Sequence, residues 1–146
     1  MCRVPGYWGF HKNYYPVTWL RKAKAFNNIC ILYLFVDNAL VSMSANNFAE
    51  ALLTLEQADK MNPGNPLIIN NKSVCLLYLG RLKEALAVLE SELTSDPRNF
   101  LRETHVLNLA TLYELESSYA GQKKQALLDT MSQFAGDGVN ISCLKF

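Results

Sequence analysis

The sequence contains little of what enzymes and nucleic-acid-binding proteins need. It has two histidines and seven scattered glycines in 146 residues. No glycine-rich loop opens a helix after a strand, and no Ser-His-Asp or Cys-His arrangement can be recognised. The 14 basic and 13 acidic residues give a formal net charge of +1, which argues against the clustered basic surface of a nucleic-acid-binding domain. We therefore expect no catalytic residues, no cofactor, no small-molecule substrate and no nucleic acid.

His105 and the two short basic segments of the sequence need no catalytic or nucleic-acid-binding role. His105 falls near the start of a predicted helix, and we interpret it as a surface or capping histidine. Residues 21–24 and Lys123 with Lys124 are the only dense basic segments, and both are short enough to be solvated patches.

The four cysteines do not form a metal site or a disulfide framework. Cys2, Cys30, Cys75 and Cys143 show no CxxC spacing and no accompanying histidine pair. Cys75 lies in an apolar segment, where we expect it to be buried as a small hydrophobic residue. This usage fits a reducing, cytoplasmic setting.

Long hydrophobic runs are absent too. Residues 29–36 form an apolar run of eight, preceded by basic residues and followed by small ones, which superficially resembles a signal peptide. Polar residues bracket the run, and it is shorter than the roughly 18 residues that a membrane span requires. We interpret it as part of a buried helix and expect no membrane insertion.

The sequence does contain an internal repeat of 34 residues. Four pairs of similar residues recur at that distance: Pro63 and Pro97, Ala51 and Ala85, Leu55 and Leu89, and Ala39 and Ser73. Two antiparallel helices pack closely only where their side chains are small. We therefore expect six small residues at the helix crossings: Ala39, Ala51, Ala58, Ser73, Ala85 and Ala110. A period of 34 is typical of tetratricopeptide repeats, each of which is a helical hairpin.

The predicted fold is all-α, with these hairpins stacked as a short right-handed solenoid. The array covers residues 29–135, in units of about 29–63, 64–97 and 98–135. Asn47 and Glu50 resemble a capping box that starts the second helix of the first unit. Asn65 followed by Pro66 is expected to cap the next unit. The third unit is distorted, because its first helix needs about three extra residues after Pro97.

The ends of the chain do not follow the repeat. Residues 1–28 are rich in aromatic residues, are broken by glycine and proline and show no helical period, so we predict an irregular segment that either caps the first repeat or is foreign to the array. Residues 136–146 are predicted to be a C-terminal tail. Two full units and one distorted unit are near the minimum for independent stability, so we expect a marginally stable chain with apolar surface at its N-terminal edge.

The binding surface of such an array is the groove lined by the first helix of each unit. In the second unit the register places five residues there: Leu67, Asn70, Val74, Leu77 and Tyr78. In the first unit it places Tyr33, Val36, Leu40 and Met43 there. Several of these side chains could instead be core residues covered by the neighbouring repeat.

Beyond the generic repeat, several segments resemble one family. They are residues 46–51, 70–80, 108–109 with 111–118, 123–128 and 143–145. Together they resemble the family of subunit 12 of the transport protein particle (TRAPP) complex, over roughly the last four-fifths of the chain. The resemblance implies a non-catalytic scaffold subunit that binds other TRAPP subunits. It also implies a cytoplasmic location at the Golgi and the ER–Golgi intermediate compartment, with roles in ER-to-Golgi transport and autophagy. Family members are much longer, so the chain looks like a C-terminal fragment or an incomplete gene model.

The alternative is another repeat adaptor, such as a co-chaperone or a ubiquitin-pathway module. Co-chaperone repeats that clamp an acidic peptide terminus need Lys and Arg at several groove positions. Here the matching positions are Val36, Leu40, Asn71, Thr104 and Asn108. Because the basic residues are missing, the sequence disfavours a carboxylate clamp and favours a helix or extended segment as ligand.

Overall fold

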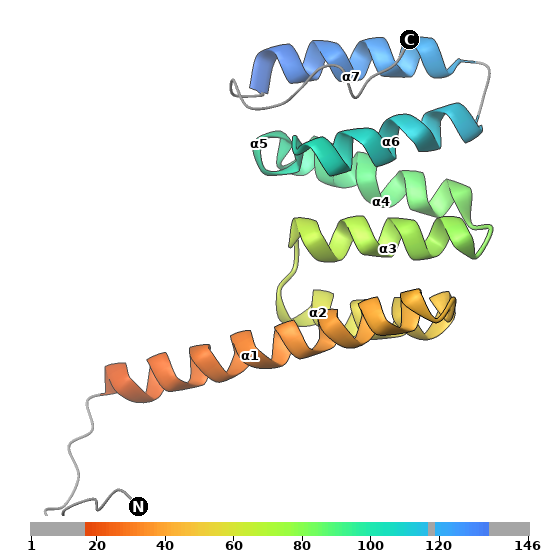
Figure 1. Ribbon diagram of the computed structural model, residues 1–146. Coiled ribbons are helices and arrows are strands. Elements are labelled where there is room, and N and C mark those ends of the chain that lie inside the picture. Colours follow the sequence, from red (N-terminus) through yellow and green to blue (C-terminus); the bar gives the residue numbers. More distant parts are fainter. Residues whose placement is uncertain (1–16, 117–118, 135–146) are drawn as a thin grey trace, which may run out of the picture.

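The computed structural model describes residues 17–116 and 119–134, with side chains placed from residue 25 onwards. Within these ranges all the regular structure is helical (Figure 1). The helices are α1 (Val17–Ser44), α2 (Phe48–Met61), α3 (Pro66–Tyr78), α4 (Leu82–Ser95), α5 (Pro97–Phe100), α6 (Glu103–Glu116) and α7 (Ala120–Phe134).

The helices form hairpins that stack in chain order. α1 packs on α2, α3 on α4, and α6 on α7, while α2 against α3 and α4 against α6 join successive hairpins. Figure 1 shows the stack running from α1 at the bottom to α7 at the top. The predicted all-α stack of helical hairpins is thus confirmed.

The 34-residue period is visible in the backbone. Asn46 has a φ of 60° and Gly80, 34 positions later, a φ of 75°. Both residues end the first helix of a unit in the left-handed region, which glycine enters at little cost and asparagine more readily than most residues. The C-caps of α2 and α4, Asn62 and Asp96, share φ −142° and ψ 77°. The repeat therefore fixes turn geometry as well as helix position.

Two local predictions are corrected. Helix α1 begins at Val17, so residues 17–28, predicted to be irregular, are helical; residues 1–16 lie outside the described part. The capping box at Asn47 does not form, because its side chain makes no bond to the backbone and instead donates Nδ2–H to Glu50 Oε2 at 2.5 Å. Asn65 does cap α3, since its Oδ1 accepts the backbone N–H of Leu67 at 3.0 Å.

The displacement of the third unit comes from an extra helical turn. α5 begins at Pro97 and is capped by Asp96, whose Oδ1 accepts the backbone N–H of Asn99 at 3.2 Å. The turn ends in Phe100 and Leu101, which are both buried. Strict repetition from Pro66 would start the next helix at residue 100, but α6 starts at Glu103. Burial of two large apolar side chains stabilises this insertion.

The core is a continuous apolar layer between the two rows of helices. Its fully buried large side chains include Leu55, Ile68, Leu89 and Leu109. All six small residues expected at the crossings, from Ala39 to Ala110, are buried as well. Cys75 is buried as predicted, and this burial raises the pKa of its thiol to about 11, which keeps it protonated and unreactive.

Helix α7 is held to the stack partly by charge, contrary to the interpretation of Lys123 and Lys124 as a solvated patch. Lys124 is buried and its Nζ bonds the Glu114 carboxylate. Lys123 pairs with Glu116, lies 3.8 Å from Glu90 and sits 5.0 Å from the centre of the Tyr113 ring. A buried ammonium group needs such partners because desolvation is costly.

One helix in the described part is long and apolar enough to cross a membrane. It is the Ala25–Ser44 part of α1, 20 residues with a mean hydropathy of 1.4. This window is longer than the eight-residue run seen in the sequence, since Val41 and Met43 extend it. The core helix of a soluble protein and a signal sequence near the N-terminus pass the same test. Val36 and Ala39 of α1 are buried in the array, but only 11% of the window is buried. The interpretation of residues 29–36 as part of a buried helix is therefore wrong, since Val36 is the one buried residue of that run.

Candidate functional site: an apolar groove beside α1

The described surface is hollowed where α1 extends past the end of α2. One cavity of about 420 Å³ lies among α1, the start of α3 and the turn before α6. It is lined by Ile29, Leu32, Tyr33, Val36, Asn62, Asn65, Pro66, Leu67 and Arg102. A second cavity of about 500 Å³ shares Ile29, Leu32 and Asn62 with it. We call the two together the α1 groove.

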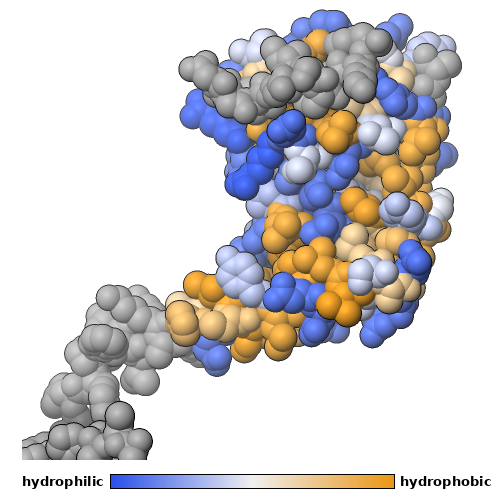
Figure 2. All heavy atoms as spheres, viewed as in Figure 1, coloured by the Kyte–Doolittle hydropathy of each residue, from blue (hydrophilic) through white to orange (hydrophobic). Residues whose placement is uncertain are grey.

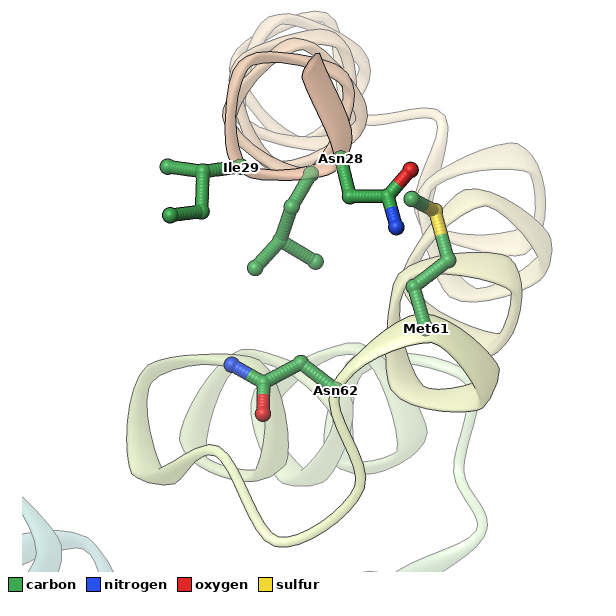
Figure 3. Close-up of a pocket in the computed structure, with 5 residues that line it drawn as sticks. Asn28, Ile29, Met61 and Asn62 are labelled. Carbon is green, nitrogen blue, oxygen red and sulfur yellow. The ribbon is translucent and has the colours of Figure 1, made fainter. Parts of the chain in front are cut away.

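Figure 3 shows the second cavity at close range, with Asn28 and Ile29 projecting from α1 above Met61 and Asn62. These last two residues end α2, so the helical overhang of α1 forms one wall and the α2–α3 connection the other. Figure 2 shows hydrophobic residues gathered over α1. The overhang exists because α1 is a 28-residue helix paired with a 14-residue partner.

The groove combines apolar walls with a few fixed polar groups. Ile29, Leu32 and Leu67 supply aliphatic surface, and Tyr33 is an exposed aromatic ring. Among the residues whose side chains the structure describes, Arg102 is the one charged residue that lines either cavity. Its guanidinium donates to Asn99, through Nε to the backbone carbonyl at 3.2 Å and through Nη2 to Oδ1 at 3.1 Å. None of the described lining residues is acidic. An apolar peptide surface with an acceptor or carboxylate near Arg102 matches this chemistry.

The five residues predicted from α3 do not all share this cavity. Leu67 is exposed and lines it, whereas Val74 and Leu77 are half-buried further along the helix. Tyr78 is exposed at the opposite end of α3, where its ring stacks on Phe48 with centroids 4.2 Å apart and planes 4° apart. Tyr78 therefore shields α2 at a place distant along the helix from Leu67.

Asn70 is engaged inside the array. Its Oδ1 accepts a hydrogen bond from Asn108 Nδ2 of α6 at 2.8 Å, and its backbone carbonyl accepts one from Ser73 at 2.7 Å. Asn71 is buried and donates to the carbonyl of Leu67 at 3.0 Å. The Asn70–Asn108 pair joins the second and third units, and neither residue lines the α1 groove.

The first-unit candidates divide between surface and core. Tyr33 and Leu40 are exposed, Met43 is half-buried and Val36 is largely buried in the core cluster. Sequence reasoning missed Ile29, Leu32 and the loop residue Asn62. The apolar run at 29–36 was visible, but only the length of α1 shows that it overhangs the α2–α3 connection.

The prediction for His105 was wrong. Predicted as a surface or capping residue, it is buried, and its Nε2 lies 2.7 Å from the carbonyl oxygen of Pro66. Since that carbonyl can only accept, Nε2 carries a proton. Burial, partly offset by this hydrogen bond, lowers the pKa of the imidazole below its usual 6.5. The Phe100 ring packs edge-on at 5.4 Å. His105 thus joins α6 to the start of α3 and plays a structural part.

Metal-ligating side chains do not gather in the described residues: no group of three or more His, Cys, Asp or Glu could hold a metal ion there. The described residues that line the groove include neither a nucleophile nor a paired base.

Comparison with known proteins gives the repeat type and the relatives. The tetratricopeptide repeat family matches residues 42–99. Trafficking protein particle complex subunit 12 of Homo sapiens is 45% identical over 114 residues, which are 78% of this chain and 16% of the human protein. This is a tetratricopeptide-repeat chain similar to TRAPP subunit 12. The resemblance seen in the sequence is thereby confirmed.

Two further relatives bear on the comparison. Trafficking protein particle complex subunit 12 of Mus musculus is 44% identical over 114 residues, 78% of this chain and 14% of the mouse protein. U-box domain-containing protein 70 of Oryza sativa subsp. japonica is 32% identical over 71 residues, 47% of this chain and 9% of that protein. The chain thus spans about a sixth of the TRAPP relatives or less.

Proposed function

We propose that this chain is a non-catalytic scaffold segment of a TRAPP vesicle-tethering complex, and that its α1 groove binds a helix or extended segment of another TRAPP subunit. The observation that carries the proposal is the groove. Its described lining is an apolar surface with amide side chains and the cation Arg102, on a chain that is 45% identical over 78% of its length to a subunit of that complex. Apolar anchor pockets of this kind bind persistent partners in other assemblies.

The groove favours binding through apolar contacts over recognition of a ligand by several charged groups. Of the positions that a carboxylate clamp would use, Val36 and Asn71 are buried and Asn108 is engaged by Asn70. Arg102 supplies one cation beside Thr104. A single guanidinium selects one carboxylate or carbonyl on a ligand, while Ile29 and Leu67 provide the larger apolar contact.

The wider role follows from the same relatives. We propose that the chain acts with TRAPP subunits in ER-to-Golgi transport and autophagy, on the cytoplasmic side of the Golgi and the ER–Golgi intermediate compartment. In this role it binds proteins and carries out no reaction. The similarity to the human and mouse subunits supports this proposal.

A second candidate function is an adaptor in the ubiquitin pathway. The match to U-box domain-containing protein 70 favours it, but that match covers less than half of the chain. The TRAPP relatives cover more of the chain at higher identity. The two candidates differ in the proteins that should accompany the chain from cells.

The experiment is affinity purification of the tagged protein from cells, followed by mass spectrometry. We expect TRAPP subunits, and we expect Leu67→Glu to reduce them because it places a charge in the apolar groove. Leu53→Glu is the matched control, since Leu53 is an exposed leucine on α2 outside the groove. Recovery of ubiquitin ligases without TRAPP subunits would favour the second candidate, and equal recovery with both variants would exclude the groove.

A further inference from the structure

A second surface, separate from the groove, lies on the outer face of α1. The repeat itself allows α1 to be compared with α3, position by position, at a spacing of 34. Ile68 and Cys75 of α3 have no exposed surface, whereas their counterparts in α1, Leu34 and Val41, are 60% and 67% exposed. At these two positions the successive units therefore differ completely in burial.

The cause is a neighbouring helix. Ile68, Lys72 and Cys75 lie on one face of α3, at spacings of four and seven residues. Lys72 on that face bonds Asp59 of α2 at 2.7 Å, so this is the face that α2 covers. The same face of α1, Leu34, Asn38 and Val41, has no helix of the described part before it. We call these three residues, with Asp37, the outer stripe.

We propose that the outer stripe is a docking surface for an amphipathic α-helix of another polypeptide, which packs on α1 as α2 packs on α3 and brings a lysine or arginine to Asp37. The interface would continue the one that already repeats inside the array. It goes beyond the groove described above and does not depend on it.

Asp37 determines the charge of the partner. It is the only charged residue from position 25 to position 44. Its counterpart in α3, Asn71, is buried and satisfied by the Leu67 carbonyl. A helix that covered Asp37 in the same way would bury a carboxylate, which requires a cation on the partner. At the α2–α3 contact the acid is on α2 and the base is on α3. At the outer stripe the acid, Asp37, is on α1, so the base must be on the partner helix.

The same residues argue against a second copy of this chain as the occupant. A two-fold pairing of outer stripes would bring two Asp37 carboxylates together, which is unfavourable. Head-to-tail stacking would need an apolar face on α7. The exposed positions there include Gln122, Gln125, Asp129 and Gln133, which form a polar stripe at helical spacing beside the exposed Ala126 and Phe134.

A membrane is also disfavoured as the occupant. The span that passes the length test, Ala25–Ser44, includes Val36 and Ala39, which are buried in the core. Moving that span into a bilayer would strip α1 from α2. It would also carry Asp37 and the amide of Asn38 into hydrocarbon.

The test measures binding of a fluorescent peptide to the full 146-residue chain. The peptide has the α2 sequence, residues 48–61, and is held helical by a hydrocarbon staple. The staple replaces positions 53 and 57, which are exposed in α2. By repeat equivalence the peptide places position 59 opposite Asn38, beside Asp37. We expect the peptide with Asp59→Lys to bind about two- to fivefold more tightly than the unsubstituted peptide. We expect Asp37→Lys in the protein to reverse that preference.

Two protein variants locate the contact. Val41→Glu should weaken peptide binding roughly tenfold or more, because it places a charge against the apolar stripe. Leu53→Glu in α2 should leave binding unchanged; both sites are exposed leucine or valine positions, so both variants should fold. Equal binding of the two peptides, or no reversal by Asp37→Lys, would overturn the proposal. The proposal would also be overturned if the chain self-associated, or bound phosphatidylcholine vesicles, and Val41→Glu abolished that binding.

Discussion

His105 of α6 donates its Nε2–H to the carbonyl oxygen of Pro66, the first residue of α3, across 2.7 Å. The two residues are 39 positions apart and belong to successive units. The bond joins the third unit, whose first helix is displaced by the α5 turn, to the regular part of the array. Its donor is an ionisable group, so the junction responds to pH.

The first prediction concerns this pH response. Because burial lowers the pKa of His105 in the folded state, the unfolded state binds more protons just below pH 6.5. Stability is therefore fully present above about pH 6.5 and declines as the pH falls from there toward the folded pKa. Urea denaturation at a series of pH values measures this. His105→Leu should remove its share of the slope and cost about 1 kcal/mol at pH 7.5 through the lost hydrogen bond. A stability that rises between pH 6.5 and 5.5 would contradict the burial of a neutral imidazole.

The second prediction tests the helix crossing in the second unit. Ala85 of α4 is fully buried, so Ala85→Leu should overpack the contact and lower the free energy of unfolding by roughly 1–3 kcal/mol. Ala87, two residues along the same helix, is exposed, and Ala87→Leu should change stability by less than about 0.5 kcal/mol. Thermal melts of both variants make the comparison, and equal melting temperatures would place the crossing elsewhere.

A third prediction separates two glycines by backbone conformation. Gly80 has a φ of 75°, while Gly121 lies within helix α7, and a Cβ meets nothing within 4 Å at either site. Gly80→Ala should destabilise the chain by about 1–2 kcal/mol, because an L-residue is strained in the left-handed region. Gly121→Ala should be neutral or stabilise by up to about 1 kcal/mol. Chemical denaturation of the two variants measures the backbone strain at Gly80, since crowding is excluded at both positions.

The fourth prediction concerns the ion pair between units one and two. Lys72 and Asp59 are partly buried and 2.7 Å apart. Asp59→Lys should cost about 1–2 kcal/mol by placing like charges together, and Lys72→Asp in the same chain should recover most of the loss. A double-mutant cycle in urea measures the coupling. Independent effects of the two substitutions would show that the pair contributes nothing to the interface.

Much of this architecture can be predicted from the sequence because it depends on local periodicity. Neighbouring side chains and turn residues determine three of its features. These are the 34-residue spacing, the small residues from Ala39 to Ala110 and the start of α3 at Asn65–Pro66. These features place α2, α3 and α4 nearly to the residue. Cys75 could be assigned to the core for the same reason.

Only the tertiary structure decided the rest. Whether His105 is exposed depends on Pro66, 39 residues away, and whether Lys124 is solvated depends on Glu114 in another helix. The groove and the outer stripe depend on which faces of α1 find a neighbour, and Leu34 differs from Ile68 for that reason alone. A sequence specifies what each helix face prefers; burial is a property of the contacts among helices, so it appears only when they are stacked.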